Sequence, residues 1–184
     1  SSDLEVNVSC PNVESEGMAF GVDPKVVEQV TKAVRKVTDK PVIVKLSPNV
    51  TDIVEIAKAV EAGGGNGVSL INTLLGMAID IHRRKPLLGN IYGGLSGPAV
   101  KPVALRMVHQ VYKGVTIPII GLGGIMSGTD AIEFMMAGAQ AVQVGTATMV
   151  DPTAISRIAR EMGDYVERYN LNSITDIIGA VHQS

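Results

Sequence analysis

The 184-residue chain has 16 lysines and arginines against 18 aspartates and glutamates, a formal net charge of −2, which gives no electrostatic basis for binding nucleic acid. Its single cysteine excludes an internal disulfide and suits a reducing compartment. No apolar run approaches the roughly 20 residues of a membrane span. We therefore expect residues 1–184 to form a single cytoplasmic α/β domain, with neither nucleic acid nor a membrane as partner.

Five apolar, β-branched runs alternate along the chain with five segments of helical spacing. Strands are predicted at residues 4–10, 41–48, 67–73, 117–125 and 141–147, and helices at 23–37, 51–63, 102–114, 128–138 and 151–169. Asp23 followed by Pro24 predicts the start of the first helix, and Thr51 is the expected cap of the second. We expect a long loop between 73 and 102, and a short last helix near 173–180.

The alternation favours a parallel sheet with right-handed crossovers, because the strands are apolar enough to be covered on both faces. Two α/β architectures fit: an open doubly wound sheet, or part of a (β/α)8 barrel. The last two strands end in the glycine-rich turns GLGGI and VGTA, and barrels commonly bind phosphate after strands 7 and 8. The first strand would then be strand 4. Since a whole barrel typically takes about 250 residues, we expect an incomplete TIM-type barrel of about five strands.

The two glycine-rich turns are candidates for a phosphate cradle. Gly123, Gly124 and Gly145 have no Cβ, so their backbone N–H groups can approach an anion closely, and each turn opens a helix. Thr146 adds a hydroxyl. A valine at Gly124 or Gly145 would intrude on the phosphate and leave the fold largely intact. The alternative is that these glycines only make tight strand-to-helix turns.

Lys45 interrupts the apolar strand PVIVKLSP. In an alternating strand Val42, Val44 and Leu46 share one face, while Ile43 and Lys45 lie on the other. A buried cation needs a partner, because burying an unpaired charge is very costly. An anionic ligand or cofactor at the sheet edge would supply one; the alternatives are a structural ion pair or an ammonium group that reaches solvent.

Polar side chains gather where the first and third strands end. Cys10 stands in a loop with serine, asparagine and glycine, which favours a reactive thiol, although a free cysteine is often just a small buried residue. Asn7 lies on the same edge, and Asn72 and Thr73 close the third strand with groups suited to a planar polar ligand. The alternative for the last two is ordinary capping and turn chemistry.

Other polar residues give no catalytic or metal pattern. His82, His109 and His182 have neither the spacing of a metal site nor that of a nucleophilic triad, so we predict no metal. HRRK (82–85) is expected to be a solvated loop, with an electrostatic docking patch as the alternative. The paired methionines of EFMMAG are expected in a helix core.

Six motifs, in order, resemble the dihydroorotate dehydrogenases: NVSCPN, VKLSPN, LINTLLGM, GGLSGPAVKP, IPIIGLGGI and VQVGTA. The resemblance covers about residues 4 to 152. Cysteine in the SCPN loop is typical of the soluble class 1, and NVESEGMAFG with LINTLLGM…GGLSGPA is most similar to the class 1B catalytic subunit. The resemblance implies the C-terminal part, strands 4 to 8, of an FMN-binding (β/α)8 barrel that oxidises dihydroorotate to orotate in pyrimidine biosynthesis. It also implies a partner subunit, carrying FAD and a 2Fe-2S cluster, that passes electrons to NAD.

The resemblance assigns roles to residues already singled out. Cys10 would be the base that removes the C5 proton of dihydroorotate while the C6 hydride passes to N5 of FMN. Lys45 would stabilise the charge of reduced FMN at its N1/O2 edge. Substrate would be held by Asn7, Asn72 and Thr73. FMN would be lined by Asn7, Lys45, Ile71, Gly97, Gly123, Gly124, Gly145 and Thr146, the last four around its phosphate.

The family's strands 1 to 3, which supply further flavin contacts and a substrate-binding lysine and asparagine, precede the SCPN strand and are not in this sequence. We therefore expect an incomplete site, and a homo-oligomer, because an incomplete barrel leaves two strand edges unpaired. Two alternatives stay open: a non-catalytic FMN- or phosphate-binding half-barrel that self-associates, and a related pyrimidine-reducing flavoenzyme.

Overall fold

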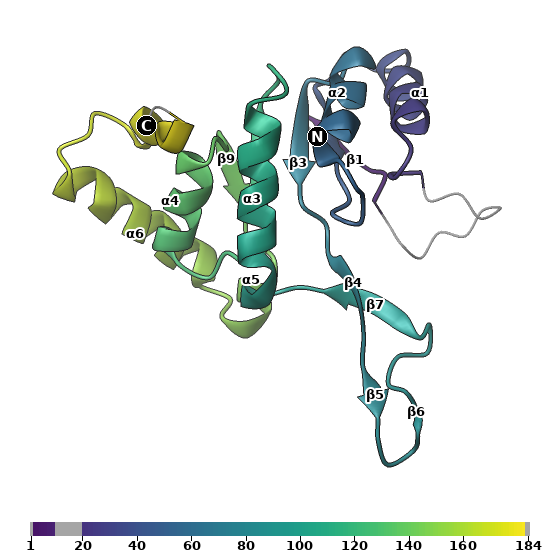
Figure 1. The fold of residues 1–184 in the computed structure, drawn as a ribbon. Coiled ribbons are helices and arrows are strands. Elements are labelled where there is room, and N and C mark those ends of the chain that lie inside the picture. Colours follow the sequence, from purple (N-terminus) through teal and green to yellow (C-terminus); the bar gives the residue numbers. More distant parts are fainter. Residues whose placement is uncertain (1, 10–19, 183–184) are drawn as a thin grey trace.

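A parallel sheet of five strands forms the centre of the fold in a computed structural model that describes residues 2–9 and 20–182 (Figure 1). The strands are β1 (Leu4–Asn7), β2 (Val42–Lys45), β3 (Gly67–Leu70), β8 (Ile119–Leu122) and β9 (Ala141–Gln143), and they lie side by side in chain order. A doubly wound sheet reverses its strand order at a switch point, whereas a barrel adds each strand beside the last. The observed order is that of the barrel.

Each of the five parallel strands is followed by a helix, as predicted, and the first four of these helices return the chain for the next parallel strand. These helices are α1 (Pro24–Arg35), α2 (Ile53–Ala62), α3 (Lys101–Tyr112), α4 (Gly128–Met136) and α6 (Ala154–Arg168). A short helix that was not predicted, α5 (Thr146–Val150), begins where the last strand was expected to continue. The short last helix near 173–180 is replaced by two 3₁₀ turns, η2 (Ile174–Ile177) and η3 (Ala180–His182).

The helix caps confirm one prediction and correct another. Asp23 caps α1 by accepting a hydrogen bond from the Lys25 N–H over 2.8 Å. The prediction that Thr51 caps α2 is wrong, because Asp52 does so by accepting from the Val54 N–H over 2.8 Å. Both residue types are good N-caps, and the helix simply begins one residue later than the sequence pattern indicated.

The alternating faces of β2 are as predicted. Val42, Val44 and Leu46 are fully buried against the helices, whereas Lys45 is only half-buried on the opposite face. In register, Asn7 lies opposite Lys45, and Lys45 lies opposite Ser69 of β3. We call the face that carries Lys45 and Ser69 the inner face, because it is the face turned away from the helices.

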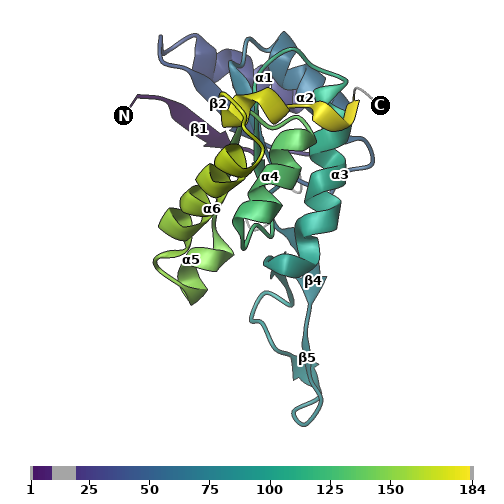
Figure 2. The same ribbon diagram turned by 90° about the vertical axis from the view of Figure 1, so that its left-hand side faces the viewer.

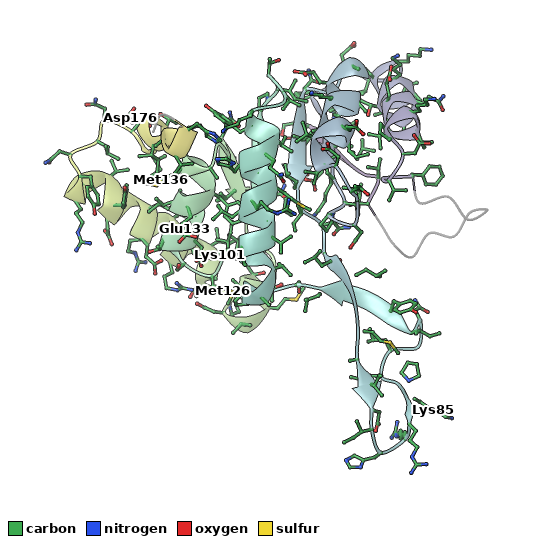
Figure 3. All side chains as sticks on the ribbon, in the orientation of Figure 1. Lys85, Lys101, Met126, Glu133, Met136 and Asp176 are labelled. Atoms are coloured by element: carbon green, nitrogen blue, oxygen red, sulfur yellow. The ribbon has the colours of Figure 1, made fainter. Side chains whose placement is uncertain are left out.

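A projecting antiparallel ribbon occupies much of the segment where a long loop was expected (Figures 1 and 2). Strand β4 (Leu74–Met77) pairs with β7 (Tyr92–Leu95), and β5 (Ile79–Asp80) pairs with β6 (Lys85–Pro86). The 3₁₀ turn η1 (Pro98–Val100) then leads into α3. The predicted solvated loop at 82–85 forms the exposed far end of this ribbon, where Figure 3 shows Lys85.

Apolar side chains are also exposed along the ribbon. Those at least two-fifths exposed are Leu75, Met77, Ile79, Ile81, Leu87, Leu88, Ile91, Tyr92 and Leu95. Of the paired methionines in EFMMAG, Met135 is buried, as predicted for a helix core, whereas Met136 is only half-buried at the edge of a smaller cluster. Within residues 2–9 and 20–182, no helix is long and apolar enough to cross a membrane, and no three His, Cys, Asp or Glu side chains are grouped so that they could hold a metal ion.

Candidate functional site

A cavity of about 240 Å³ opens at the carboxyl edge of the sheet. It lies where β2, β3, β8 and β9 end and where the ribbon returns to the barrel. Nine residues that the sequence singled out line it: Lys45, Ile71, Asn72, Thr73, Gly97, Gly123, Gly124, Gly145 and Thr146. Sequence reasoning missed further lining residues: Leu95, Ser96, Val100, Leu122, Ile125, Gln143 and Met149. One edge therefore brings together candidates from four consecutive parallel strands.

Lys45 reaches this cavity from the inner face of β2. Its side chain forms no ion pair with any residue that the structure describes. The interpretation as a structural ion pair is therefore not supported in the described part of the chain. A half-buried cation facing a cavity is an attractive position for an anionic ligand.

Asn7 and Asn72 hold the chain that leaves β1. The Asn7 Oδ1 accepts hydrogen bonds from the Ser9 N–H over 3.1 Å and from the Ser9 hydroxyl over 2.6 Å. The Asn72 Nδ2 donates to the Ser9 carbonyl over 3.0 Å. Asn72 lines the cavity, whereas Asn7 is not among the cavity-lining residues. Cys10, the next residue in the sequence, lies outside the described residues.

Asn49, which the sequence reading did not single out, fixes the entrance to the ribbon. Its side chain donates to the Thr73 carbonyl over 3.3 Å and accepts from the Leu75 N–H over 2.9 Å. On the opposite side, the Thr146 hydroxyl donates to the Ser96 hydroxyl over 2.9 Å. Both strands of the ribbon are thus tied to loops at the carboxyl edge, and the ribbon base forms part of the cavity wall.

The glycines of the two turns differ in what surrounds them. Gly124 has a φ of +79°, and a Cβ there would lie 2.7 Å from the Gly97 carbonyl oxygen and 2.8 Å from the Lys101 nitrogen. A Cβ at Gly145 would meet no atom within 4 Å. The expectation that a valine at Gly124 leaves the fold largely intact is therefore wrong, because the side chain would collide with backbone. For Gly145 that expectation stands.

The N-terminus of α4 is already occupied by side chains of the protein. The Ser127 hydroxyl accepts from the Asp130 N–H over 3.2 Å, and Asp130 accepts from the Met126 and Ser127 N–H groups over 2.9 and 3.0 Å. Glu161 of α6 accepts from the Gly128 N–H. The expected anion site at this helix start is therefore filled by carboxylates. The loop amides of Gly124 and Gly145, which donate to no acceptor in the described residues, are the better anion donors.

An ionic cluster lies next to the glycine-rich turn that precedes α4. Lys101 of α3 contacts Asp130 over 2.6 Å and Glu133 over 2.9 Å, and Figure 3 shows Lys101 and Glu133 near each other between α3 and α4. These two hydrogen bonds raise the pKa of Lys101. Burial works to raise the pKa of Asp130, but hydrogen bonds from Lys101, Met126 and Ser127 outweigh it, so that pKa is lowered. The cluster joins α3 to α4 behind the glycine turn.

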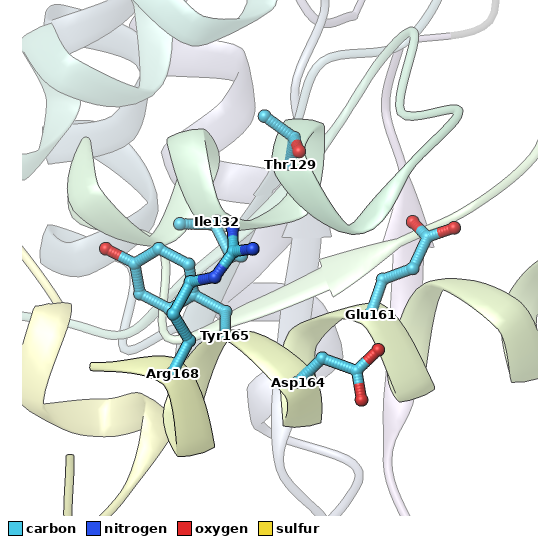
Figure 4. Close-up of a pocket in the computed structure, with 6 residues that line it drawn as sticks. All are labelled: Thr129, Ile132, Glu161, Asp164, Tyr165 and Arg168. Atoms are coloured by element: carbon cyan, nitrogen blue, oxygen red, sulfur yellow. The ribbon is translucent and has the colours of Figure 1, made fainter. Parts of the chain in front are cut away.

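A second cavity of about 320 Å³ lies between α4 and α6 (Figure 4). It is lined by Thr129, Ile132, Glu161, Asp164, Tyr165 and Arg168. None of these residues was a predicted site residue. Glu161 is engaged with Gly128 and Arg157, and the hydrogen bond from the Gly128 N–H, followed by that from Arg157, lowers its pKa. The carboxyl-edge cavity remains the better candidate site.

Comparison with known proteins gives one consistent result. The family model described as "Dihydroorotate dehydrogenase" matches residues 1–166. The chain is 63% identical over 179 residues to "Dihydroorotate dehydrogenase B (NAD(+)), catalytic subunit" of Desulforamulus reducens, covering 97% of this chain and 59% of that protein. To the protein of the same name from Alkaliphilus oremlandii it is 61% identical over 176 residues, covering 96% and 58%.

A solved structure extends the comparison to the fold. The crystal structure of DHODH in complex with ferulenol from Eimeria tenella matches with a TM-score of 0.82 and 25% identity, over 100% of this chain and 55% of that chain. The five-stranded parallel sheet thus matches about half of a TIM barrel, which confirms the predicted architecture. The chain spans less than two thirds of the length of these curated relatives.

Proposed function

Because this chain belongs to the dihydroorotate dehydrogenase family, we propose that it supplies strands 4 to 8 of an FMN-binding (β/α)8 barrel that oxidises dihydroorotate to orotate in pyrimidine biosynthesis. One observation carries the proposal: residues predicted for cofactor and substrate, from the ends of four neighbouring strands, line a single cavity. The carboxyl face of the strands is where TIM-barrel enzymes place their active sites.

The residues around the cavity fit FMN in charge and in shape. Lys45 supplies a positive charge that no ion pair within the described residues neutralises. Gly145 has open space where a side chain would otherwise lie, and loop N–H groups can donate to phosphate. Asn72 and Thr73 add polar groups for a planar ligand. Pockets for small ligands usually measure about 300–1,000 Å³, so a cavity of about 240 Å³ holds part of such a ligand. The family's strands 1 to 3 would complete the wall.

When bound, FMN supplies the acceptor for the two electrons of the substrate. Cys10 takes the proton from C5 of dihydroorotate, with Asn72 and Thr73 orienting the pyrimidine ring. Lys45 places a positive charge where negative charge develops during the reaction. A thiol acts as a base only in its thiolate form, and an ordinary thiol has a pKa near 8.5. Activity should therefore rise toward alkaline pH.

We further propose that electrons leave through a partner subunit that carries FAD and a 2Fe-2S cluster and reduces NAD. The support is the name of the relatives, which are catalytic subunits of a dihydroorotate dehydrogenase B (NAD(+)). The chain is about 60% identical to these subunits. This identity favours NAD as the final electron acceptor over the other acceptors that flavoenzymes use.

The test is to add FMN to the purified protein, remove free flavin and oxygen, and titrate with dihydroorotate while recording the visible flavin absorbance. Bleaching with formation of orotate supports the proposed function. Bound FMN that dihydroorotate does not bleach would instead identify a flavin-binding half-barrel. A protein that takes up no FMN, even when combined with strands 1 to 3 of a relative, contradicts the proposal.

A further inference from the structure

A carboxylate on the inner face lies near Lys45 but is not paired with it. The Ser69 hydroxyl donates to the Glu5 Oε1 over 2.6 Å, and the Gln143 Nε2 donates to the same oxygen over 3.1 Å. Ser69 is fully buried in the middle strand, whereas Glu5 and Gln143 come from the two edge strands β1 and β9. None of the ion pairs among the described residues joins Glu5 to Lys45.

The backbone positions of Glu5 and Lys45 allow an ion pair. Glu5 lies opposite Ile43 in register, and Lys45 is two residues further along the same strand. Strand rise and spacing put such diagonal neighbours about 8 Å apart at the backbone, a gap that a glutamate and a lysine can bridge. The two hydrogen bonds instead engage the Glu5 carboxylate with Ser69 of β3, the residue opposite Lys45, and with Gln143 of β9.

We propose that Gln143 and Ser69 are positioning residues that hold Glu5 apart from Lys45, so that the lysine charge stays available to the flavin. This inference rests on the proposed function. Gln143 and Lys45 both line the cavity. A change in the hydrogen bonds of Gln143 would therefore alter the charges next to a bound ligand. The Ser69 hydroxyl and the Gln143 amide are neutral, so they hydrogen-bond to the Glu5 carboxylate without bringing a second positive charge. A Glu5–Lys45 ion pair would instead cancel the field that attracts negative charge into the cavity.

The test is the midpoint potential of the flavin in the FMN-loaded protein, measured against a reference dye. Gln143→Leu removes one of the two hydrogen bonds that hold Glu5, so that its carboxylate can shift to pair with Lys45. This should lower the equilibrium constant for flavin reduction about tenfold, which is about 30 mV for a two-electron couple. Glu5→Gln should not lower it, since no carboxylate remains to pair. The double variant Glu5→Gln/Gln143→Leu should match Glu5→Gln alone.

Gln140→Leu is the matched control. Gln140 precedes β9 at the opposite end of the strand and accepts a hydrogen bond from the Ile119 N–H over 2.7 Å. Its loss should reduce stability and leave the potential unchanged. The inference is overturned if Gln143→Leu keeps the parent potential, or if the double variant is as low as Gln143→Leu.

A crystal structure of flavin-free Gln143→Leu tests the position of the Glu5 carboxylate without depending on the cofactor. The carboxylate of Glu5 should lie within about 4 Å of the Lys45 ammonium, the usual limit of an ion pair. A carboxylate that stays in its parent position overturns the inference, whether or not the parent binds flavin. A parent that is not bleached by dihydroorotate contradicts the proposed function instead, so the two failures are distinguishable.

Discussion

Replacing Gly124 by alanine should destabilise the protein by about 2–5 kcal/mol. An L-residue in the left-handed conformation, here with φ of +79°, costs about 1–2 kcal/mol. The new Cβ would also lie 2.7 Å from the Gly97 carbonyl oxygen and 2.8 Å from the Lys101 nitrogen. Both are backbone atoms that cannot rotate away, and overpacking of this kind costs about 1–3 kcal/mol.

Urea unfolding measures this effect, with Gly145→Ala as the matched control. Gly145 has a φ of −108° and open space around its missing Cβ, so alanine should change the free energy of unfolding by less than about 1 kcal/mol. The midpoint should fall for Gly124→Ala at an unchanged slope, as for a pure loss of stability. If both variants unfold at the same urea concentration, the packing argument for Gly124 is refuted.

Four further predictions concern the site and its support. Gly145→Val should leave stability nearly unchanged and weaken FMN binding at least about tenfold by fluorescence titration; an unchanged affinity in the folded variant would exclude this part of the cradle. Cys10→Ser in the FMN-loaded protein should slow flavin reduction by dihydroorotate about 10²–10⁴-fold at pH 7, with a smaller loss at higher pH, in stopped-flow measurements; the parent rate would return Cys10 to a packing role. The lowered pKa values of Asp130 and Glu161 mean that their contribution to stability is complete above the unfolded-state values near 4 and is lost as pH falls through the folded-state values. Asp130→Asn should therefore flatten the acid limb of a stability-against-pH curve, and an unchanged limb would contradict that role. Because β1 and β9 each pair on one side only in the described residues, light scattering at micromolar concentration should show a dimer or larger assembly rather than a monomer.

The sequence predicted the sheet and much of the cavity because parallel strands impose strong rules. Alternation along β2 placed Lys45 on the face opposite Val44. The carboxyl ends of parallel strands meet at one edge, so Asn72 and Gly124 could be assigned to one site without knowing any contact. These inferences depend only on local pattern and on the direction of the strands.

Features that depend on distant contacts were not predictable in this way. Glu5 and Gln143 each look like solvent-facing polar residues in short strands, and only the curvature of the sheet brings them together. The ribbon was missed because its strands are short and glycine-containing, as in YGGL of β7, which is a weak strand signal. The hydrogen bond from the Gly128 N–H at the start of α4 to Glu161 depends on packing against α6, which no local motif indicates.

The hydrogen bond between Glu5 and Gln143 joins residues 138 positions apart, so we expect it to form late as the chain folds. Contacts of such large sequence separation form slowly, because the intervening chain must be ordered before they can be made. Helices such as α1 and α2 can form early from local contacts. The cavity needs β9 in place beside β8, since Gly145 and Thr146 follow it directly. Capture of flavin should therefore report the final step of folding, and a folding intermediate that already contains the helices should remain colourless.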